Sequence, residues 1–160
     1  MTGVQTCALP IFGLGLMHLI ISFGNLTDYG TNFAFVQHVL SMDTIFPDSH
    51  VQYRAIHLPW MHHLFYSVII ALELLISYFF LKGTVALTRS LHKERLDFEA
   101  AKQPAFRGVA AGILLWLLIF SVVGAEWFSM WQSQQWNGVA AASRNLLLIM
   151  TTYVLLLIVH

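Results

Sequence analysis

The sequence predicts an all-α integral membrane protein: a bundle of four membrane-spanning helices with a short amphipathic helix in the first outer loop. Of the 160 residues, 58% are hydrophobic and only 10% are charged, whereas soluble domains carry about 25% charged residues. The mean hydropathy is correspondingly high, at +0.69. Eight basic and eight acidic residues cancel, so we expect the lipid bilayer as a partner and no nucleic acid.

Four segments are apolar enough to cross the hydrocarbon core, which takes about 20 helical residues. They are residues 12–25, 62–82, 105–127 and 139–159. The first is short because MTGVQTCALPI, residues 1–11, matches the translation of a common sequencing-library adapter. We therefore expect residues 1–11 to be a sequencing artefact and exclude them from the fold prediction. Residues 12–160 are then a single four-span transmembrane domain.

The basic residues predict the orientation of the spans. Six of the eight lie in or beside the loop between the second and third spans: Lys82, Arg89, Lys93, Arg95, Lys102 and Arg107. Loops rich in Lys and Arg stay in the cytoplasm. Both termini are therefore expected in the cytoplasm, and the first and third loops are expected outside.

Both long loops have helical patterns. Residues 31–42, TNFAFVQHVLSM, begin with a capping residue and place apolar side chains near helical spacing. This pattern predicts a short amphipathic helix at the outer interface. Residues 84–103 predict a polar helical extension in the cytoplasm. Pro104 fits the first helical position of the third span, where its missing N–H costs nothing.

Polar residues inside the first two spans are expected to face the bundle interior, because an ionisable group there costs about 2.5–3.5 kcal/mol on insertion scales. At 100° per residue, one stripe of the second span carries His62, Tyr66, Glu73 and Ser77. One face of the first span carries His18, Ser22 and Asn25. Glu73 lies near mid-membrane and is expected either to be protonated and hydrogen-bonded, or to relay protons or bind a cation.

Small and charged residues predict how the last two spans pack. Gly108 and Gly112 form a small-xxx-small pattern that lets helices approach closely. Glu126 follows Gly108 by eighteen residues, five turns of an α-helix, so it should share this inward face. On the fourth span, Arg144 shares a face with Thr151. We predict an ion pair between Glu126 and Arg144 that either fixes helix register or binds a substrate.

The stretch EWFSMWQSQQWNG, residues 126–138, follows the third span and holds three tryptophans: Trp127, Trp131 and Trp136. Because indole rings favour the membrane–water interface, these residues predict an aromatic belt. Five histidines lie in or beside the first outer loop: His38, His50, His57, His62 and His63. Imidazole binds metals, but no compact ligand motif is present. We predict no metal, no cofactor and no catalytic residue.

Three outer motifs, GNLTDYGTNFAFVQHVLSMDTIFPD, YRAI and GAEWFSMWQSQQWNG, together with Arg144, resemble a bacterial family of predicted small integral membrane proteins, domain of unknown function 2165. The likeness covers nearly all of residues 12–160. It implies four membrane helices and no established activity. The resemblance places the family's outer signature on Asn25, Asp28, Tyr29, Asn32, Phe35, Gln37, His38, Met42, Asp43, Arg54, Glu126, Trp127, Trp131, Asn137, Gly138 and Arg144. Ala125 departs from it, since glycine is expected there.

Because the signature lies on the two outer loops, it predicts a shared polar cap. The leading hypothesis is a non-enzymatic bundle in the bacterial inner membrane whose cap binds a partner protein, a lipid headgroup or a small ligand. The expected cap residues are Asn25, Asp28, Tyr29, Asn32, His38, Asp43, Arg54, Glu126, Trp127, Trp131, Asn137 and Arg144.

Two alternatives stay open. One is a small proton- or ion-coupled transporter subunit that uses Glu73 and His18. Its size would demand assembly into a homo-oligomer or with a partner membrane protein to enclose a path. The other is a membrane haem or metal protein that uses the outer histidines His38, His62 and His63.

Overall fold

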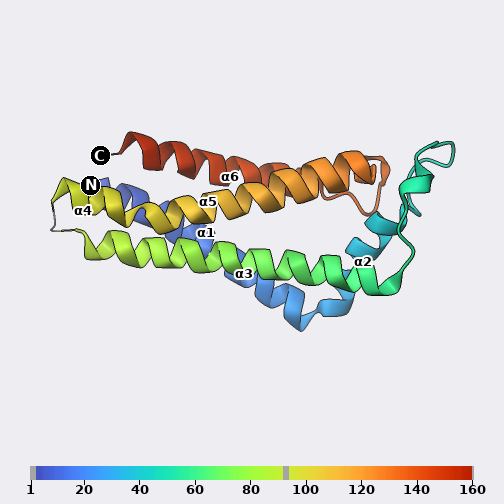
Figure 1. Ribbon diagram of the computed structural model, residues 1–160, viewed down its shortest axis with the longest axis horizontal. Coiled ribbons are helices and arrows are strands. Elements are labelled where there is room, and N and C mark those ends of the chain that lie inside the picture. The colour runs from blue at the N-terminus through green and yellow to red at the C-terminus, as the bar shows by residue number, and fades with distance from the viewer. Residues whose placement is uncertain (1–2, 92–93, 160) are drawn as a thin grey trace.

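The computed structural model describes residues 3–91 and 94–159, and these residues form helices and loops only. Four helical segments are long and apolar enough to cross a membrane. They are α1 (Gly3–Thr27), α3 (Pro59–Arg89), α5 (Gln103–Ile113) continued by η2 (Leu114–Trp127), and α6 (Val139–Ile158). They run side by side along the long axis of the molecule (Figure 1). The predicted all-α fold with four spans is confirmed.

The two ends of the bundle differ. At one end, called here the α2 end, lie α2 (Tyr29–Ser41) and the short 3-10 turns η1 (Gln52–Arg54) and η3 (Met130–Gln132). The other end, the α4 end, holds α4 (Arg95–Ala101) and both ends of the chain (Figure 1). The helix predicted over residues 31–42 is therefore present as α2. It buries Val36 and Leu40.

α1 is longer than the sequence indicated. It begins at Gly3 rather than near residue 12, and Cys7 and Ile11 are fully buried in the core. Residues 3–11 of the segment assigned to an adapter translation thus continue the first helix in the structure, while residues 1 and 2 lie outside the described residues. The origin of this segment as a sequencing artefact stays a prediction.

Glycines allow the long helices to approach closely. A Cβ atom added at Gly83 of α3 would lie 3.0 Å from the backbone nitrogen of Ala105 in α5. One added at Gly108 would lie 2.9 Å from the Phe80 ring, and one at Gly112 would lie 2.5 Å from the Ile149 side chain. The close packing predicted from the small-xxx-small pattern is therefore confirmed on α5.

η2 is a π-helix, in which backbone hydrogen bonds join residues five positions apart. Two contacts show this spacing: the Phe128 N–H donates to the Val123 carbonyl at 3.0 Å, and the Ser121 hydroxyl donates to the Trp116 carbonyl at 2.8 Å. A π-helix turns less per residue than an α-helix. Side chains beyond Ile113 therefore lie on other faces of the helix than the 3.6-residue period of an α-helix predicts.

At the α4 end, one lysine links α4 to the residue after α6. Lys102 is only 1% exposed. Its Nζ donates to the Glu99 carboxylate at 2.9 Å and to the Val159 carbonyl just after α6. A cation near the last carbonyls of a helix is favourable. The predicted polar extension is helical up to Arg89 and again in α4, while residues 92 and 93 lie outside the described residues.

Candidate functional site

A buried polar cluster lies between α1 and α3. Glu73 is 2% exposed, and its Oε2 accepts a hydrogen bond of 2.6 Å from Asn25 Nδ2. The Tyr66 hydroxyl donates to the Asn25 carbonyl at 3.0 Å. All four members of the predicted stripe, His62, Tyr66, Glu73 and Ser77, are buried. The sequence thus predicted their inward face, and the structure adds Asn25 as the partner of Glu73.

His18 forms a separate contact deeper in the bundle. Its Nδ1 donates to the Leu14 carbonyl at 2.9 Å, and its Nε2 accepts from Trp116 Nε1 at 3.1 Å. A carbonyl only accepts and an indole N–H only donates, so these contacts fit the neutral tautomer with hydrogen on Nδ1. His18 therefore links α1 to η2, with both ring nitrogens satisfied.

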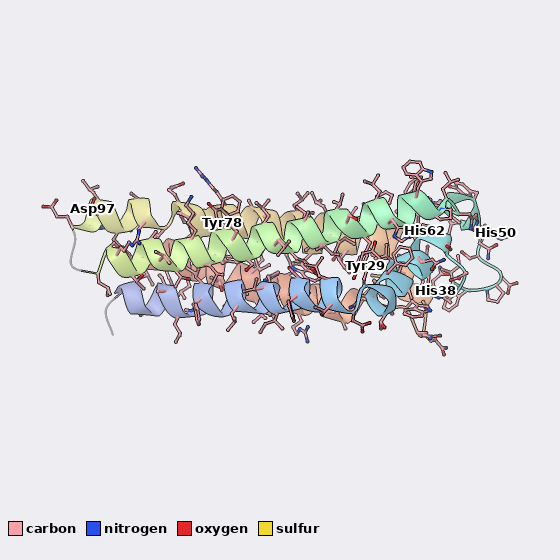
Figure 2. The ribbon with its side chains drawn as sticks, turned by 90° about the horizontal axis from the view of Figure 1, so that it is seen from below. Tyr29, His38, His50, His62, Tyr78 and Asp97 are labelled. Atoms are coloured by element: carbon pink, nitrogen blue, oxygen red, sulfur yellow. The ribbon has the colours of Figure 1, made fainter. Side chains whose placement is uncertain are left out.

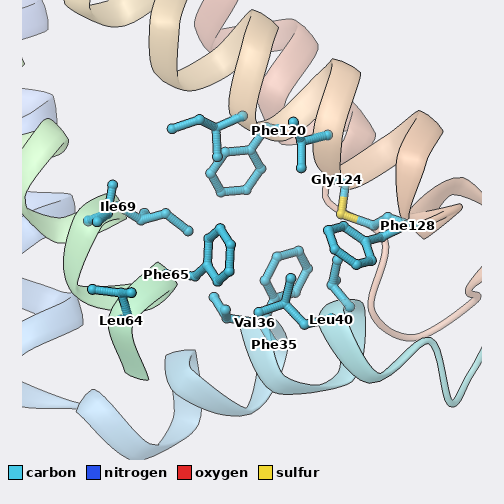
Figure 3. A pocket seen from close by; sticks show the side chains of 14 residues that line it. Phe35, Val36, Leu40, Leu64, Phe65, Ile69, Phe120, Gly124 and Phe128 are labelled. Atoms are coloured by element: carbon cyan, nitrogen blue, oxygen red, sulfur yellow. The ribbon is translucent and has the colours of Figure 1, made fainter. Parts of the chain in front are cut away.

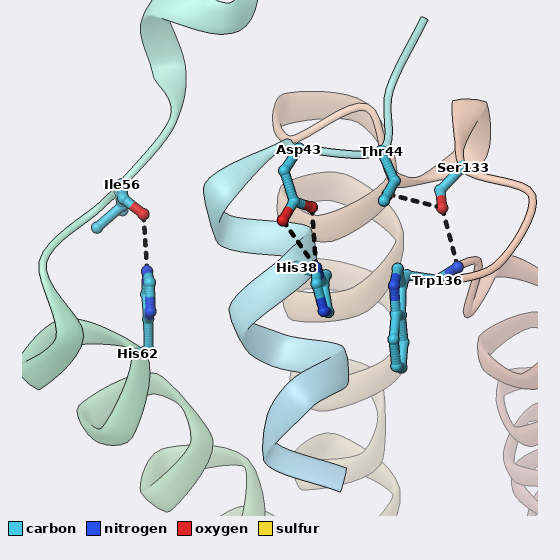
Figure 4. A network of polar contacts seen from close by, with 7 residues as sticks. All are labelled: His38, Asp43, Thr44, Ile56, His62, Ser133 and Trp136. Carbon is cyan, nitrogen blue, oxygen red and sulfur yellow. Dashed lines mark hydrogen bonds and ion pairs between the residues drawn. The ribbon is translucent and has the colours of Figure 1, made fainter. Parts of the chain in front are cut away.

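The two loops at the α2 end join to form a cap, defined as residues 28–58 and 128–138. The Thr44 hydroxyl donates to Ser133 Oγ at 2.9 Å, and Ser133 Oγ accepts from the Trp136 N–H at 2.9 Å (Figure 4). The Phe46 N–H donates to Gln132 Oε1 at 3.1 Å. The two loops that were predicted to share a cap therefore contact one another.

Aromatic contacts add to these hydrogen bonds. The His38 ring stacks on Trp136 with centroids 4.6 Å apart, and its Nδ1 donates to Asp43 Oδ2 at 2.8 Å (Figure 4). Arg54 donates to the Trp127 carbonyl at 3.2 Å, and its guanidinium lies 4.6 Å from the centroid of the Trp127 ring. Such cation–π contacts stabilise by about 0.5–1 kcal/mol at exposed sites.

Other predicted cap residues make local contacts. The Tyr29 hydroxyl and His63 Nδ1 are 2.9 Å apart, and Asn32 donates to the Asp28 carbonyl at 3.3 Å. Figure 2 shows Tyr29, His38, His50 and His62 gathered at the α2 end. Two further contacts involve Asn137, which donates to the Trp131 carbonyl at 3.3 Å and accepts from the Val139 N–H at 3.0 Å. Asn25 instead joins the buried cluster below the cap.

The predicted ion pair of Glu126 and Arg144 is wrong. Both side chains are exposed, and neither forms an ion pair with any residue that the structure describes. The π-helical geometry of η2 removes Glu126 from the glycine face of α5. Thr151, on the same face as Arg144, is exposed too.

Among the described residues, the histidines of the first outer loop do not share a common partner. His62 Nε2 donates to the Ile56 carbonyl at 2.7 Å (Figure 4), whereas His50 and His57 are exposed. Within residues 3–91 and 94–159, no three His, Cys, Asp or Glu side chains come together at metal-binding distances.

At the base of the cap lies an apolar pocket of about 270 Å³ between α2, α3 and η2 (Figure 3). Phe65 of α3 and Phe120 of η2 line it, and Val36, Leu40 and Phe128 of the cap form another part of its wall. Every lining residue is apolar. Sequence reasoning missed this pocket, because apolar side chains that line a cavity look the same in a sequence as those that fill a core.

The pocket has an open side toward the membrane-facing surface. Three of its lining residues, Leu64, Val68 and Val123, are 52%, 41% and 38% exposed. Leu64 and Val68 belong to α3, and Val123 belongs to η2. A hydrocarbon chain next to the protein could therefore reach the pocket between these two helices.

A family model described as predicted small integral membrane protein (DUF2165) matches residues 5–159. Searches of curated proteins and of solved structures gave no match.

Proposed function

We propose that this chain, which belongs to that family of predicted small integral membrane proteins, is a non-enzymatic protein that binds one hydrocarbon chain of a membrane lipid in the apolar pocket. The observation that carries the proposal is the pocket itself: about 270 Å³, lined by apolar residues alone and open beside Leu64 and Val68. Ligand pockets are concave and mostly apolar, with polar groups that set specificity.

The chemistry of the lining favours hydrocarbon. A reacting substrate needs polar groups that orient it and move protons, and the pocket lining offers none. An apolar cavity of about 150 Å³ is already large enough to hold benzene. A pocket of about 270 Å³ therefore has room for a longer stretch of an acyl or prenyl chain.

The cap supplies groups that suit a lipid headgroup. Phe128 and Met130, which line the pocket, are neighbours in sequence of Trp127 and Trp131. Arg54, half-buried beside Trp127, offers a planar guanidinium that matches phosphate or carboxylate oxygens. We therefore place the headgroup at the cap, with the α2 end outside a bacterial inner membrane and the α4 end in the cytoplasm.

Native mass spectrometry of the detergent-extracted protein tests the proposal. We expect wild-type protein to retain about one lipid per chain and Gly124→Leu to lose it. Gly124 lines the pocket, and the atoms nearest to a Cβ added there, from Ile119 and Met130, lie 3.4 Å away or more. A Cβ at this position therefore fits without a clash, and we expect the rest of a leucine side chain to take up pocket space.

Gly13→Leu is the matched control. It makes the same chemical change at an exposed position of α1 where nothing lies within 4 Å of an added Cβ, so lipid retention should not change. Equal retention by wild-type and Gly124→Leu protein, or no lipid on wild-type protein incubated with inner-membrane lipid vesicles, would refute the proposal.

A second candidate is proton- or cation-coupled transport through Glu73. Its support is the burial of this carboxyl group to 2% exposure inside a span, since intramembrane ionisable residues commonly mark ion pathways. A pH-dependent flux into proteoliposomes that Glu73→Gln abolishes would separate this function from a purely structural role.

A further inference from the structure

We propose that a second copy of this chain docks on the exposed face of α6, with Arg144 of each copy paired with Glu126 of the partner subunit. The proposal is independent of lipid binding. No residue of α6 lines the pocket.

Two exposed charges on this surface, those of Arg144 and Glu126, favour pairing with a second molecule. Arg144 lies in the second turn of α6 and Glu126 in the last turn of η2, both inside helices long enough to span the membrane. Both side chains are exposed, and in the described parts of the chain neither has an ion-pair partner. Charged residues within membrane spans almost always face a bundle interior, a water-filled cavity or one another.

The two charges are complementary and lie at the same end of the bundle. Residues 128–138 connect η2 to α6 at the α2 end, so Glu126 and Arg144 both lie within about two helical turns of this end. In a dimer whose two-fold axis is perpendicular to the membrane, residues near the same end of the two copies meet at the interface. Such a dimer contains the Arg144–Glu126 contact twice, once from each copy.

The exposed side of α6 is available for contact with a second copy. Its buried residues, Ala142, Asn145, Ile149, Thr152 and Leu156, pack against the bundle. The opposite side exposes Leu147 by 67%, Val154 by 51% and Ile158 by 66%. Ala140, one turn before Arg144, is also exposed, and its small side chain lets a second helix come close.

Native mass spectrometry in mild detergent, supported by disulfide cross-linking in membranes, tests the dimer. Wild-type protein should have about twice the 18.1 kDa mass of one chain. Arg144→Glu and Glu126→Arg should each weaken the dimer by about tenfold, because each places like charges together. The double substitution should restore it. In a Cys7→Ala background, Ala140→Cys should form a cross-linked dimer.

Arg89→Glu is the control, since it reverses an exposed arginine at the α4 end of α3 and should leave the dimer intact. A wild-type monomer, or a double substitution that stays monomeric while eluting as folded protein, would overturn the proposal. So would an Arg144→Glu protein that keeps the dimer but loses adducts of anionic lipid, because Arg144 would then bind a lipid phosphate.

Discussion

The pair of half-buried Asn25 and buried Glu73 shows how one carboxyl group is accommodated between two membrane helices. The amide of Asn25 donates to Glu73 at 2.6 Å, and Tyr66 fixes the Asn25 backbone from the other side. A buried polar group costs free energy when its partner is removed. The pair therefore stabilises the α1–α3 contact as long as both members keep a hydrogen bond.

Substitutions of Glu73 separate hydrogen bonding from charge. Glu73→Gln retains an oxygen that accepts from Asn25, so its thermal stability in detergent should stay close to that of the wild type. Glu73→Leu leaves Asn25 Nδ2 unpaired and should lower the free energy of unfolding by about 1–3 kcal/mol. Thermal unfolding of the three purified proteins measures both effects.

The flux of protons or cations across the membrane of proteoliposomes then decides the role of Glu73. A pH-dependent flux that disappears in Glu73→Gln while the protein stays folded would establish transport and contradict a purely structural role. Equal destabilisation by Gln and Leu would contradict the hydrogen-bond explanation.

His18 illustrates what a sequence leaves open at this scale. Helical spacing predicted that His18, Ser22 and Asn25 share an inward face, and His18 and Ser22 are indeed fully buried. The spacing could not predict that Trp116, distant in sequence, donates to His18. Pairings between helices depend on their rotation and relative height, which a single sequence does not specify.

At the scale of elements, the crossing of α3 and α5 depends on Gly83. A methyl group there would meet the Ala105 backbone nitrogen at 3.0 Å and the Ala105 Cβ at 3.1 Å. Gly83→Ala should therefore push the two helices apart and destabilise the protein by about 1–3 kcal/mol. Chemical unfolding in detergent measures the change.

Gly24→Ala provides the comparison for this substitution. Nothing lies within 4 Å of a Cβ added at Gly24 in α1, so alanine should be neutral or stabilise by up to about 0.5–1 kcal/mol. If Gly83→Ala and Gly24→Ala behave alike, the crossing does not depend on the close approach.

η2 explains why one prediction from helical periodicity was wrong. Apolar runs in the sequence located all four spans, and Pro104 is the second residue of α5, one position after the first helical position predicted for it. Periodicity fails where the helix changes type, and no Gly or Pro in residues 114–123 signals the change. Glu126 consequently lies on the surface rather than on the glycine face.

At the scale of the whole molecule, the α2 end is aromatic and polar, whereas the α4 end carries most of the basic residues and both ends of the chain. The sequence predicted this asymmetry and the shared cap, because both follow from residue types in loops. It could not predict the pocket at the base of the cap. That space exists because α2, α3 and η2 surround it without filling it.

The orientation of the two ends can be measured by cysteine labelling on whole cells. In a Cys7→Ala background, His50→Cys at the α2 end should react with a membrane-impermeant maleimide. Leu96→Cys in α4, at a position that is 81% exposed, should react only after the membrane is permeabilised. Labelling of Leu96→Cys but not His50→Cys in intact cells would reverse the proposed topology.

Photo-cross-linking with a lipid that carries a diazirine near the end of its acyl chain tests the binding of a hydrocarbon chain most directly. In proteoliposomes, the lipid should label pocket residues such as Phe35, Phe65 and Phe120 more strongly than exposed residues of α1 such as Ile20 and Phe23. Gly124→Leu should remove the pocket labelling and leave that on α1. Labelling of α1 alone in wild-type protein, or pocket labelling that survives Gly124→Leu, would contradict the proposed binding of a lipid chain.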